Sequence, residues 1–262
     1  NYLRTVRYYG DFLGRIAERS DLIELSVNRF LADVSKRKSE STTLNHKRSL
    51  TAVWNWLSGQ NLISPYDPRR LRKISVTLPP PSPFSVGQVR ILLKAAELIT
   101  HPCQYGTSSE MLRAWILLGY ESGLRPGDMR RLRPCDFDND IVTITQHKTG
   151  KTHHFVVRPH TRSALEPLLK SGQPTLFPPA KSTMEDWQRR LFNRAKELGF
   201  KKRTRQGIGT LRKTNATEVC RHHGLEAAAR ALGHVTGTAL AIRHYVAPEA
   251  IGTTPFPPPL LE

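Results

Sequence analysis

The stretch VTLPPPSPFSVGQ, residues 76–88, most constrains how this chain can fold. Four of the five positions 79–83 are proline. Proline fixes its backbone angle and lacks an N–H donor, so such a run forms neither a helix interior nor a central strand, and it acts as a semi-rigid spacer. We therefore expect two folded parts, residues 1–78 and 85–262, joined by a linker at residues 79–84.

The first part has the apolar periodicity of helices. Apolar residues recur at helical spacing in TVRYYGDFLGRIAE, ELSVNRFLADVSKRK and TTLNHKRSLTAVWNWLSGQNLI. Ser41, Thr42 and Thr43 are N-cap candidates for the third helix, and Gly59 can end it. The pattern predicts a small helical bundle in which every helix also carries Arg and Lys.

The second part is predicted to be helical with a single β-hairpin. SSEMLRAWILLGYESG is apolar at its centre, which indicates a buried helix ending at Gly123. Pro126 begins the next helix. DIVTITQH and HHFVVRP are β-rich and are joined by KTGK, a turn containing Gly150. Further helices are predicted in TRSALEPLLKS, STMEDWQRRLFNRAKELG, GTLRKTNATEVCRHHG and LEAAARALG, the last two divided after Gly224. The fold class is therefore mainly α with a small antiparallel sheet.

The charge of the chain favours a polyanionic partner. It has 40 Lys and Arg against 22 Asp and Glu, a formal charge of +18, and nucleic acid is the simplest such partner. The sequence has no long basic amphipathic helix, lipidation signal, apolar membrane span or opening secretory signal. Three scattered cysteines, Cys103, Cys135 and Cys220, fit a reducing compartment. We expect a cytoplasmic protein, nucleoid-associated if bacterial, and a fragment of a longer chain.

Five side chains in the second part suit phosphodiester chemistry. Arginine presents a planar fork to phosphate oxygens, and two arginines can neutralise a five-coordinate transition state. A tyrosine hydroxyl, with a pKa near 10, needs a cationic pocket to act as a nucleophile. Lysine can protonate a leaving oxygen and histidine can move protons. No pattern of metal ligands is present. The candidates are Arg125, Lys148, Arg212, His234 and Tyr245.

Each of these residues alone has an ordinary structural interpretation. An arginine in so basic a chain is commonly a surface residue, and a lysine in a hairpin is commonly a turn residue. A histidine after a glycine can end a helix, and a tyrosine among aliphatic residues is usually core. The order and local context of all five favour the chemical interpretation.

Five motifs in the same order resemble those of the tyrosine recombinase (phage integrase) family: ESGLRPGDMRRLRPCDFD, ITQHKTGK, LRKTNATEV, AARALGH and IRHYV. The resemblance covers the second part, and the first part resembles the SAM-like core-binding domain of that family. It implies a mostly helical catalytic domain, a small sheet and a C-shaped clamp around double-stranded DNA.

The resemblance also implies roles for individual residues. Tyr245 is the implied nucleophile, which forms a 3′-phosphotyrosyl link before strand exchange through a Holliday junction. The family works as a homotetramer on two duplexes, without ATP, metal or another cofactor. The remaining implied catalytic residues are Arg125, Lys148, Arg212 and His234, and Asp128 is implied to support Arg125.

The chain departs from the family pattern at three places. Gly209 stands where a histidine usually precedes the second arginine, and Lys213 stands where histidine is common. The gap from His234 to Tyr245 is about two residues longer than is typical. Lys213 or His147 is a candidate substitute for the missing group. These departures leave open a weak or inactive DNA-binding protein on this scaffold. A type IB topoisomerase-like enzyme, with the same tyrosine chemistry but relaxation in place of strand exchange, is a further alternative.

Contacts with DNA outside the catalytic residues are expected to be mostly to phosphate. TTLNHKRSLTAVWNW is the candidate groove-facing helix, with Asn45, Lys47 and Arg48 exposed. The alternative is that Trp54 and Trp56 are core residues and the basic side chains are merely solvated. Lys151 and Lys213 are further candidates for DNA contact.

Overall fold

In the computed structural model, residue contacts divide the chain into two compact units, Asn1–Pro79 and Pro80–Glu262. The division falls within the proline run. The two units are described separately below. The structure describes residues 2–77, 79–103, 106–204, 206–233, 238 and 244–247.

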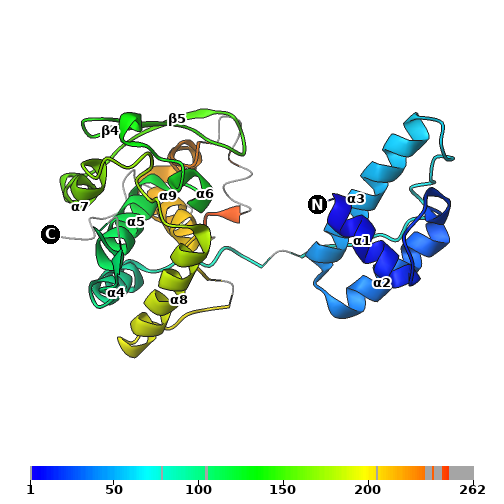
Figure 1. The fold of residues 1–262 in the computed structure, drawn as a ribbon, viewed down its shortest axis with the longest axis horizontal. Coiled ribbons are helices and arrows are strands. Elements are labelled where there is room, and N and C mark those ends of the chain that lie inside the picture. The colour runs from blue at the N-terminus through cyan, green and yellow to red at the C-terminus, as the bar shows by residue number, and fades with distance from the viewer. Residues whose placement is uncertain are drawn as a thin grey trace. The chain divides into compact units, whose positions relative to one another are not determined.

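The first unit is a helical bundle (Figure 1). Its core gathers Tyr9, Phe30, Leu31, Leu50 and Trp54, all at most 3% exposed. The amphipathic pattern of each helix places these residues on inward faces. The helices are α1 (Tyr2–Leu13), α2 (Glu24–Arg37) and α3 (Glu40–Gly59), with a 3₁₀ turn at Arg19–Asp21.

Helix α3 differs from the sequence prediction at its start. Its N-cap is Ser39, whose hydroxyl accepts a hydrogen bond from the Thr42 backbone N–H at 3.3 Å. The predicted caps at 41–43 are therefore wrong, because these residues already lie in the first helical turn. Trp54 is buried but Trp56 is 64% exposed. Residues that are two positions apart on a helix point in directions that differ by about 200°. The rings of Trp54 and Trp56 therefore cannot lie on the same face of α3.

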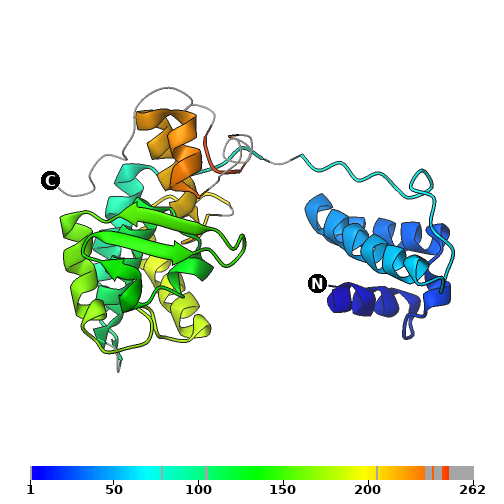
Figure 2. The ribbon, with the colours of Figure 1, turned by 90° about the horizontal axis from the view of Figure 1, so that it is seen from above.

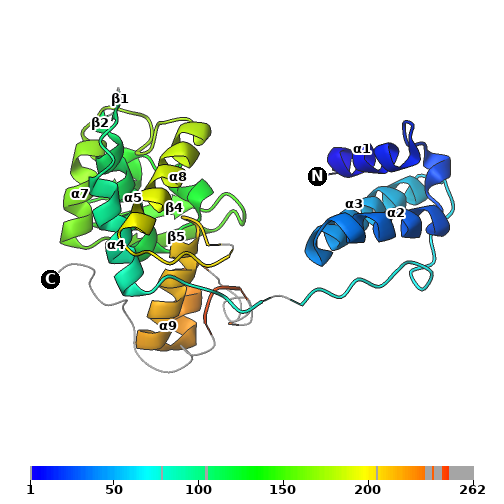
Figure 3. The ribbon, with the colours of Figure 1, turned by 90° about the horizontal axis from the view of Figure 1, so that it is seen from below.

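The second unit surrounds one buried helix, α5 (Ser108–Ser122). Helices α4, α7, α8 and α9 all contact α5 (Figures 1 and 3). Trp115, Ile116 and Leu117 are almost inaccessible to solvent, as the apolar centre of this segment predicts. The other helices are α4 (Val86–Glu97), α6 (Pro126–Met129), α7 (Pro159–Leu169), α8 (Lys181–Glu197) and α9 (Thr210–Ala231).

A three-stranded antiparallel sheet lies against the helices of this unit (Figure 2). Val142 and Ile144 face inward on the central strand, and Ile144 pairs with His153 of the next strand. The strands are β3 (Phe137–Asp138), β4 (Ile141–Thr145) and β5 (Thr152–Val156), and β1 (Pro102–Cys103) pairs separately with β2 (Gly106–Thr107). The predicted fold class, mainly α with a small antiparallel sheet, is confirmed.

Two glycines shape the ends of helices near the candidate residues. Gly123 ends α5 with a φ of 60°, and a Cβ there would lie 2.5 Å from Asn215 Oδ1. Gly224, with a φ of 76°, interrupts α9, which is therefore two helical segments joined at a kink. Only glycine adopts this backbone region readily. Both breaks fall where the sequence predicts them.

Candidate active site

The turn after α5 places Arg125 at the start of α6. Arg125 is the N-cap of this short helix, and Pro126 occupies its first position. The Arg125 side chain is 20% exposed, and its Nη1 lies 3.7 Å from Asp128 Oδ2. The same nitrogen donates a hydrogen bond to Gln146 Oε1 at 2.9 Å. The guanidinium is therefore held by polar partners while it still reaches solvent.

Asp128 ties this arginine to the β-hairpin. Its carboxylate is buried, and Oδ1 accepts a hydrogen bond from the His147 backbone N–H at 3.0 Å. A buried carboxylate requires such partners. Asp128, itself on α6, thus contacts both Arg125 and the turn after β4.

Arg212 lies in the first turn of α9 and is 4% exposed. Its Nη1 donates to the Gly123 carbonyl, and its Nη2 donates to the Leu232 carbonyl at 3.0 Å. Burial and the nearby charge of Arg125 lower its pKa to about 10, against the opposing effect of Tyr245. The group keeps its charge at neutral pH. Two neutral carbonyls therefore hold a buried cation.

Tyr245 lies against this cation. The centre of its ring is 4.9 Å from Arg212 Cζ. The Thr217 hydroxyl anchors the local backbone, because it donates to the Tyr245 carbonyl at 3.2 Å and accepts from the Ala247 N–H at 3.1 Å. α9 therefore supplies both the cation and the anchor of the tyrosine.

The pKa of the Tyr245 hydroxyl is lower than its ordinary value. Burial is the largest single influence and raises this pKa, but cations outweigh it. Arg212 acts both by its charge and by a hydrogen bond, followed by the charges of Arg125 and Lys148. The arrangement favours the phenolate, which is the nucleophilic form.

The other basic candidates are more exposed. Lys148 is exposed and lies within the turn between β4 and β5, in the KTGK segment. Lys151 is also exposed, whereas Lys213 is half-buried on α9. His234 lies outside the described residues. Of the predicted residues, the structure brings Arg125, Asp128, Arg212 and Tyr245 together, and the charge of Lys148 acts on Tyr245.

The position of the missing histidine lies beside the site. A Cβ at Gly209 would be 3.5 Å from Pro126 Cγ, next to Arg125. His147, a suggested substitute, has an exposed side chain. A different histidine is buried nearby: His153 of β5 is 7% exposed. Burial, and then the charge of Arg212, lower its pKa to about 4, so its imidazole is neutral at pH 7.

Sequence reasoning missed His153 and Gln146. The signal for His153 was strand alternation: in THHFV the second residue faces inward and His154 faces outward. Gln146 carried no such signal beyond its place before the turn. Within the described part of the chain, no group of three His, Cys, Asp or Glu side chains could hold a metal ion. No described helix is long and apolar enough to cross a membrane.

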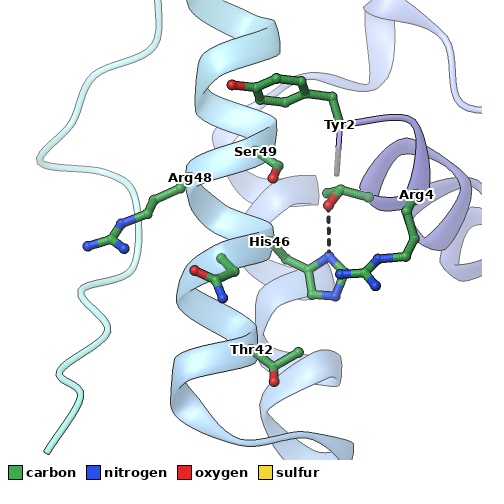
Figure 4. Close-up of a pocket in the computed structure, with 8 residues that line it drawn as sticks. Tyr2, Arg4, Thr42, His46, Arg48 and Ser49 are labelled. Carbon is green, nitrogen blue, oxygen red and sulfur yellow. Dashed lines mark hydrogen bonds between the residues drawn. The ribbon is translucent and has the colours of Figure 1, made fainter. Parts of the chain in front are cut away.

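Helix α3 of the first unit presents part of the predicted DNA-contacting set. Asn45 and Arg48 are exposed as expected. Lys47 is half-buried, and its Nζ donates to the Arg72 carbonyl at 2.7 Å, so its predicted exposure is wrong. Asn45 and Arg48 line a cavity of about 420 Å³ together with Arg4 and His46 (Figure 4).

The fold of the second unit is that of a tyrosine recombinase catalytic domain. The chain belongs to the phage integrase family, whose model matches residues 90–250. A comparison with curated proteins gave no significant match.

Solved structures share the fold at low sequence identity. A lambda integrase tetramer bound to a Holliday junction matches with a TM-score of 0.71 and 16% identity, covering 92% of this chain and 70% of the other. A lambda integrase dimer bound to a COC′ core site gives 0.69 and 16%, with the same coverage. XerH recombinase bound to its difH substrate gives 0.64 and 19%, covering 85% and 66%. These likenesses concern the fold.

Proposed function

We propose that this protein is a site-specific DNA recombinase of the integration and excision type that cuts and rejoins strands through Tyr245. The observation that carries the proposal is the contact between the Tyr245 ring and the buried Arg212 guanidinium, which lowers the pKa of the phenol. A tyrosine in a cationic pocket suits attack on a phosphodiester. Membership of the phage integrase family supports the same reaction class.

In the proposed first step, the Tyr245 oxygen attacks the scissile phosphorus. A phosphorus–tyrosine bond forms, and the bond to the 5′ oxygen breaks. Arg125 and Arg212 stabilise the charge on the non-bridging oxygens. Lys148 gives the leaving 5′ oxygen a proton, and the phenol proton passes to a base. His234 has the expected role of proton handling.

In the proposed second step, the 5′ hydroxyl of a partner strand attacks the 3′-phosphotyrosyl link. The bond to Tyr245 breaks, and a new phosphodiester forms. The covalent intermediate conserves the bond energy, so the reaction needs no nucleotide cofactor. Exchange of both strand pairs passes through a Holliday junction.

The proposed partner is double-stranded DNA, held by a homotetramer acting on two duplexes. The formal charge of +18 supports a polyanionic partner. Residues 1–78 are the proposed core-binding domain, where Asn45 and Arg48 are exposed on α3, and residues 85–262 are the proposed catalytic domain. Lys151 and Lys213 are proposed to contact phosphates beside the site.

Covalent trapping tests the proposal directly. The protein is incubated with a library of nicked duplexes of random sequence, and protein–DNA adducts are separated on a denaturing gel. Wild type and Tyr120→Phe should form an adduct, and Tyr245→Phe should form none. Tyr120 is a matched control, because it is a buried tyrosine of the same unit.

The outcomes separate the alternatives. Salt-dependent DNA binding without an adduct from any duplex would show a non-catalytic DNA-binding protein and reject the proposal. An adduct accompanied by relaxation of supercoiled plasmid, without recombinant products, would show topoisomerase-like activity. An adduct that persists in Tyr245→Phe would assign the nucleophile to another residue.

A further inference from the structure

A buried glutamine, Gln146, lies between the two arginines of the candidate site. It directly follows β4 and is 1% exposed. Its backbone N–H donates to the Lys151 carbonyl at 2.8 Å, and its carbonyl accepts from the Gly150 N–H at 2.8 Å. The hairpin turn therefore fixes the main chain of this residue.

The side-chain amide of Gln146 is bonded at both ends. Its Oε1 accepts from Arg125 Nη1 at 2.9 Å, and its Nε2 donates to the Leu232 carbonyl at 3.3 Å. The same carbonyl accepts from Arg212 Nη2 at 3.0 Å. A continuous chain of hydrogen bonds thus runs from Arg125 to Arg212 through the hairpin turn and the end of α9.

An amide suits this position better than a charged group. The two guanidiniums repel each other, and the charge of Arg125 contributes to lowering the pKa of Arg212. A carboxylate between them would cancel part of the positive charge available to a phosphate. The amide instead offers an acceptor to Arg125 and a donor to the shared carbonyl, without adding net charge.

Gly233 leaves space for this contact. A Cβ at Gly233 would lie 2.5 Å from Gln146 Nε2 and 3.4 Å from His153 Nδ1, and the glycine has a φ of 70°. A larger residue would push the amide away from the Leu232 carbonyl. The glycine therefore allows the hairpin to approach the end of α9 at the point where Arg212 is bound.

We propose that Gln146 is a positioning residue that holds Arg125 and Arg212 at a fixed separation, so that both stabilise the same phosphate in the transition state. The inference rests on the proposed function, in which both arginines stabilise the scissile phosphate. Gln146 acts through the arginines and does not itself touch the reacting atoms.

The test compares two buried glutamines. Gln146→Met removes, at similar volume, the hydrogen bonds to Arg125 and Leu232 and also the one that Oε1 accepts from the Thr149 hydroxyl at 3.2 Å. Gln206→Met is the matched control, because Gln206 is 5% exposed and its Nε2 donates to the Ser82 and Pro83 carbonyls, near the proline run.

Adduct formation on the nicked duplex is measured under single-turnover conditions. Gln146→Met should slow it by about 10²-fold, the order of effect of misplaced catalytic groups, with the Kd for DNA unchanged. Gln206→Met should retain the wild-type rate.

A second measurement requires no DNA. The pKa of Tyr245 is obtained from tyrosinate absorbance as the difference between each protein and the same protein carrying Tyr245→Phe. The charges that lower this pKa come from Arg212 on α9, Arg125 on α6 and Lys148 in the hairpin turn. Gln146→Met should raise the pKa of Tyr245, because Arg125 loses its amide acceptor and the Leu232 carbonyl that binds Arg212 loses its link to the hairpin. Gln206→Met should not.

Failure of the inference can be distinguished from failure of the proposed function. If wild type forms no adduct, the proposed function is wrong, and the titration still decides the role of Gln146. Equal results for Gln146→Met and Gln206→Met in the titration and the rate would overturn the inference. A rate loss explained entirely by weaker DNA binding would also overturn it.

A second variant covers the case in which Gln146→Met does not fold. Gln146→Glu has nearly the same shape and keeps an acceptor for Arg125, but it places an oxygen against the Leu232 carbonyl and a negative charge between the arginines. It should slow adduct formation and raise the pKa of Tyr245. If Gln146→Glu leaves both quantities at their wild-type values, Gln146 has no positioning role.

Discussion

Helices α5 and α9 pack together and place two tyrosines in opposite environments. Tyr120, within α5, is fully buried, and burial raises its pKa, with Glu218 adding to the effect. Tyr245 is half-buried beside Arg212, and its pKa is lowered. Both environments belong to one interface: Asn215 Nδ2 donates to the Tyr120 carbonyl at 2.8 Å, and Arg212 on the same helix donates to the Gly123 carbonyl.

Burial alone does not make a tyrosine reactive, because burial by itself raises the pKa of the phenol. Desolvation disfavours the phenolate at both positions, and at Tyr120 it dominates. At Tyr245 the charges of Arg212, Arg125 and Lys148 reverse its effect. What distinguishes the candidate nucleophile from a core tyrosine is the nearby arginines. Arg212 is held by two uncharged carbonyls, and Arg125 by the Gln146 amide and the Asp128 carboxylate.

The largest expected effect comes from removing the Arg212 cation, which lowers the pKa of Tyr245 and so distinguishes it from Tyr120. Arg212→Met should make Tyr245 resemble Tyr120, with its pKa raised above the ordinary value by burial. Adduct formation should fall by about 10³-fold, because the cation that stabilises the transition state is lost. Single-turnover trapping and tyrosinate titration measure the two effects. Arg230→Met, an exposed arginine on the same helix, is the control. An unchanged Tyr245 pKa in Arg212→Met would contradict the comparison.

Sequence reasoning predicted those features of this region that depend on local rules. Gly123 ends α5, Pro126 begins α6 and Gly224 divides α9, because each follows from backbone preference. The hairpin followed from its β-rich segments and its glycine-containing turn. The family of the chain followed from the order of its motifs, and the family match confirms it.

The network between the arginines depends on contacts that no local rule gives. Gln146 and Leu232 are 86 residues apart and meet through one side-chain amide. The inward orientation of His153 matters because Arg212 arrives from another helix. Lys47 lies in the same basic stretch of sequence as its exposed neighbour Arg48, but its amine donates a hydrogen bond to the Arg72 carbonyl. In each case, tertiary packing decides which polar side chain has a partner.

The second prediction concerns His153, the neutral group of the pocket. Its pKa is lowered from about 6.5 to about 4, so the unfolded chain binds a proton in this range and the folded chain does not. Stability should therefore fall as the pH drops from about 6.5 to 4, by about 3 kcal/mol for this group. His153→Gln should lose this part of the acid sensitivity, as measured by denaturant unfolding across pH.

The neighbouring histidine provides the control for this prediction. His154 faces outward on the same strand, is exposed and contacts the Thr143 hydroxyl. His154→Gln should keep the acid sensitivity of wild type. If His153→Gln and His154→Gln have the same pH dependence of unfolding, the buried imidazole is not the source of the effect.

The third prediction tests the turn at Gly123, which ends α5 and whose carbonyl accepts a hydrogen bond from Arg212. Gly123→Ala places a methyl group 2.5 Å from Asn215 Oδ1 in a left-handed backbone position. Gly172→Ala has a similar φ of 71° and no atom within 4 Å. The control should lose about 1–2 kcal/mol of unfolding free energy for its backbone alone. Gly123→Ala should lose more and also slow adduct formation, because the Gly123 carbonyl binds Arg212. Equal losses of stability would exclude the steric contribution.

The smallest expected effect comes from removing a surface cation, Arg48 of α3, in contrast to the arginines of the candidate site. Arg48→Ala should weaken DNA binding and reduce the slope of log affinity against log salt by about 1, as expected for one lost phosphate contact. Lys47→Ala should change this slope less, because the Lys47 amine is already bonded to the Arg72 carbonyl. Equal slopes for wild type and Arg48→Ala would remove Arg48 from the proposed DNA-contacting surface.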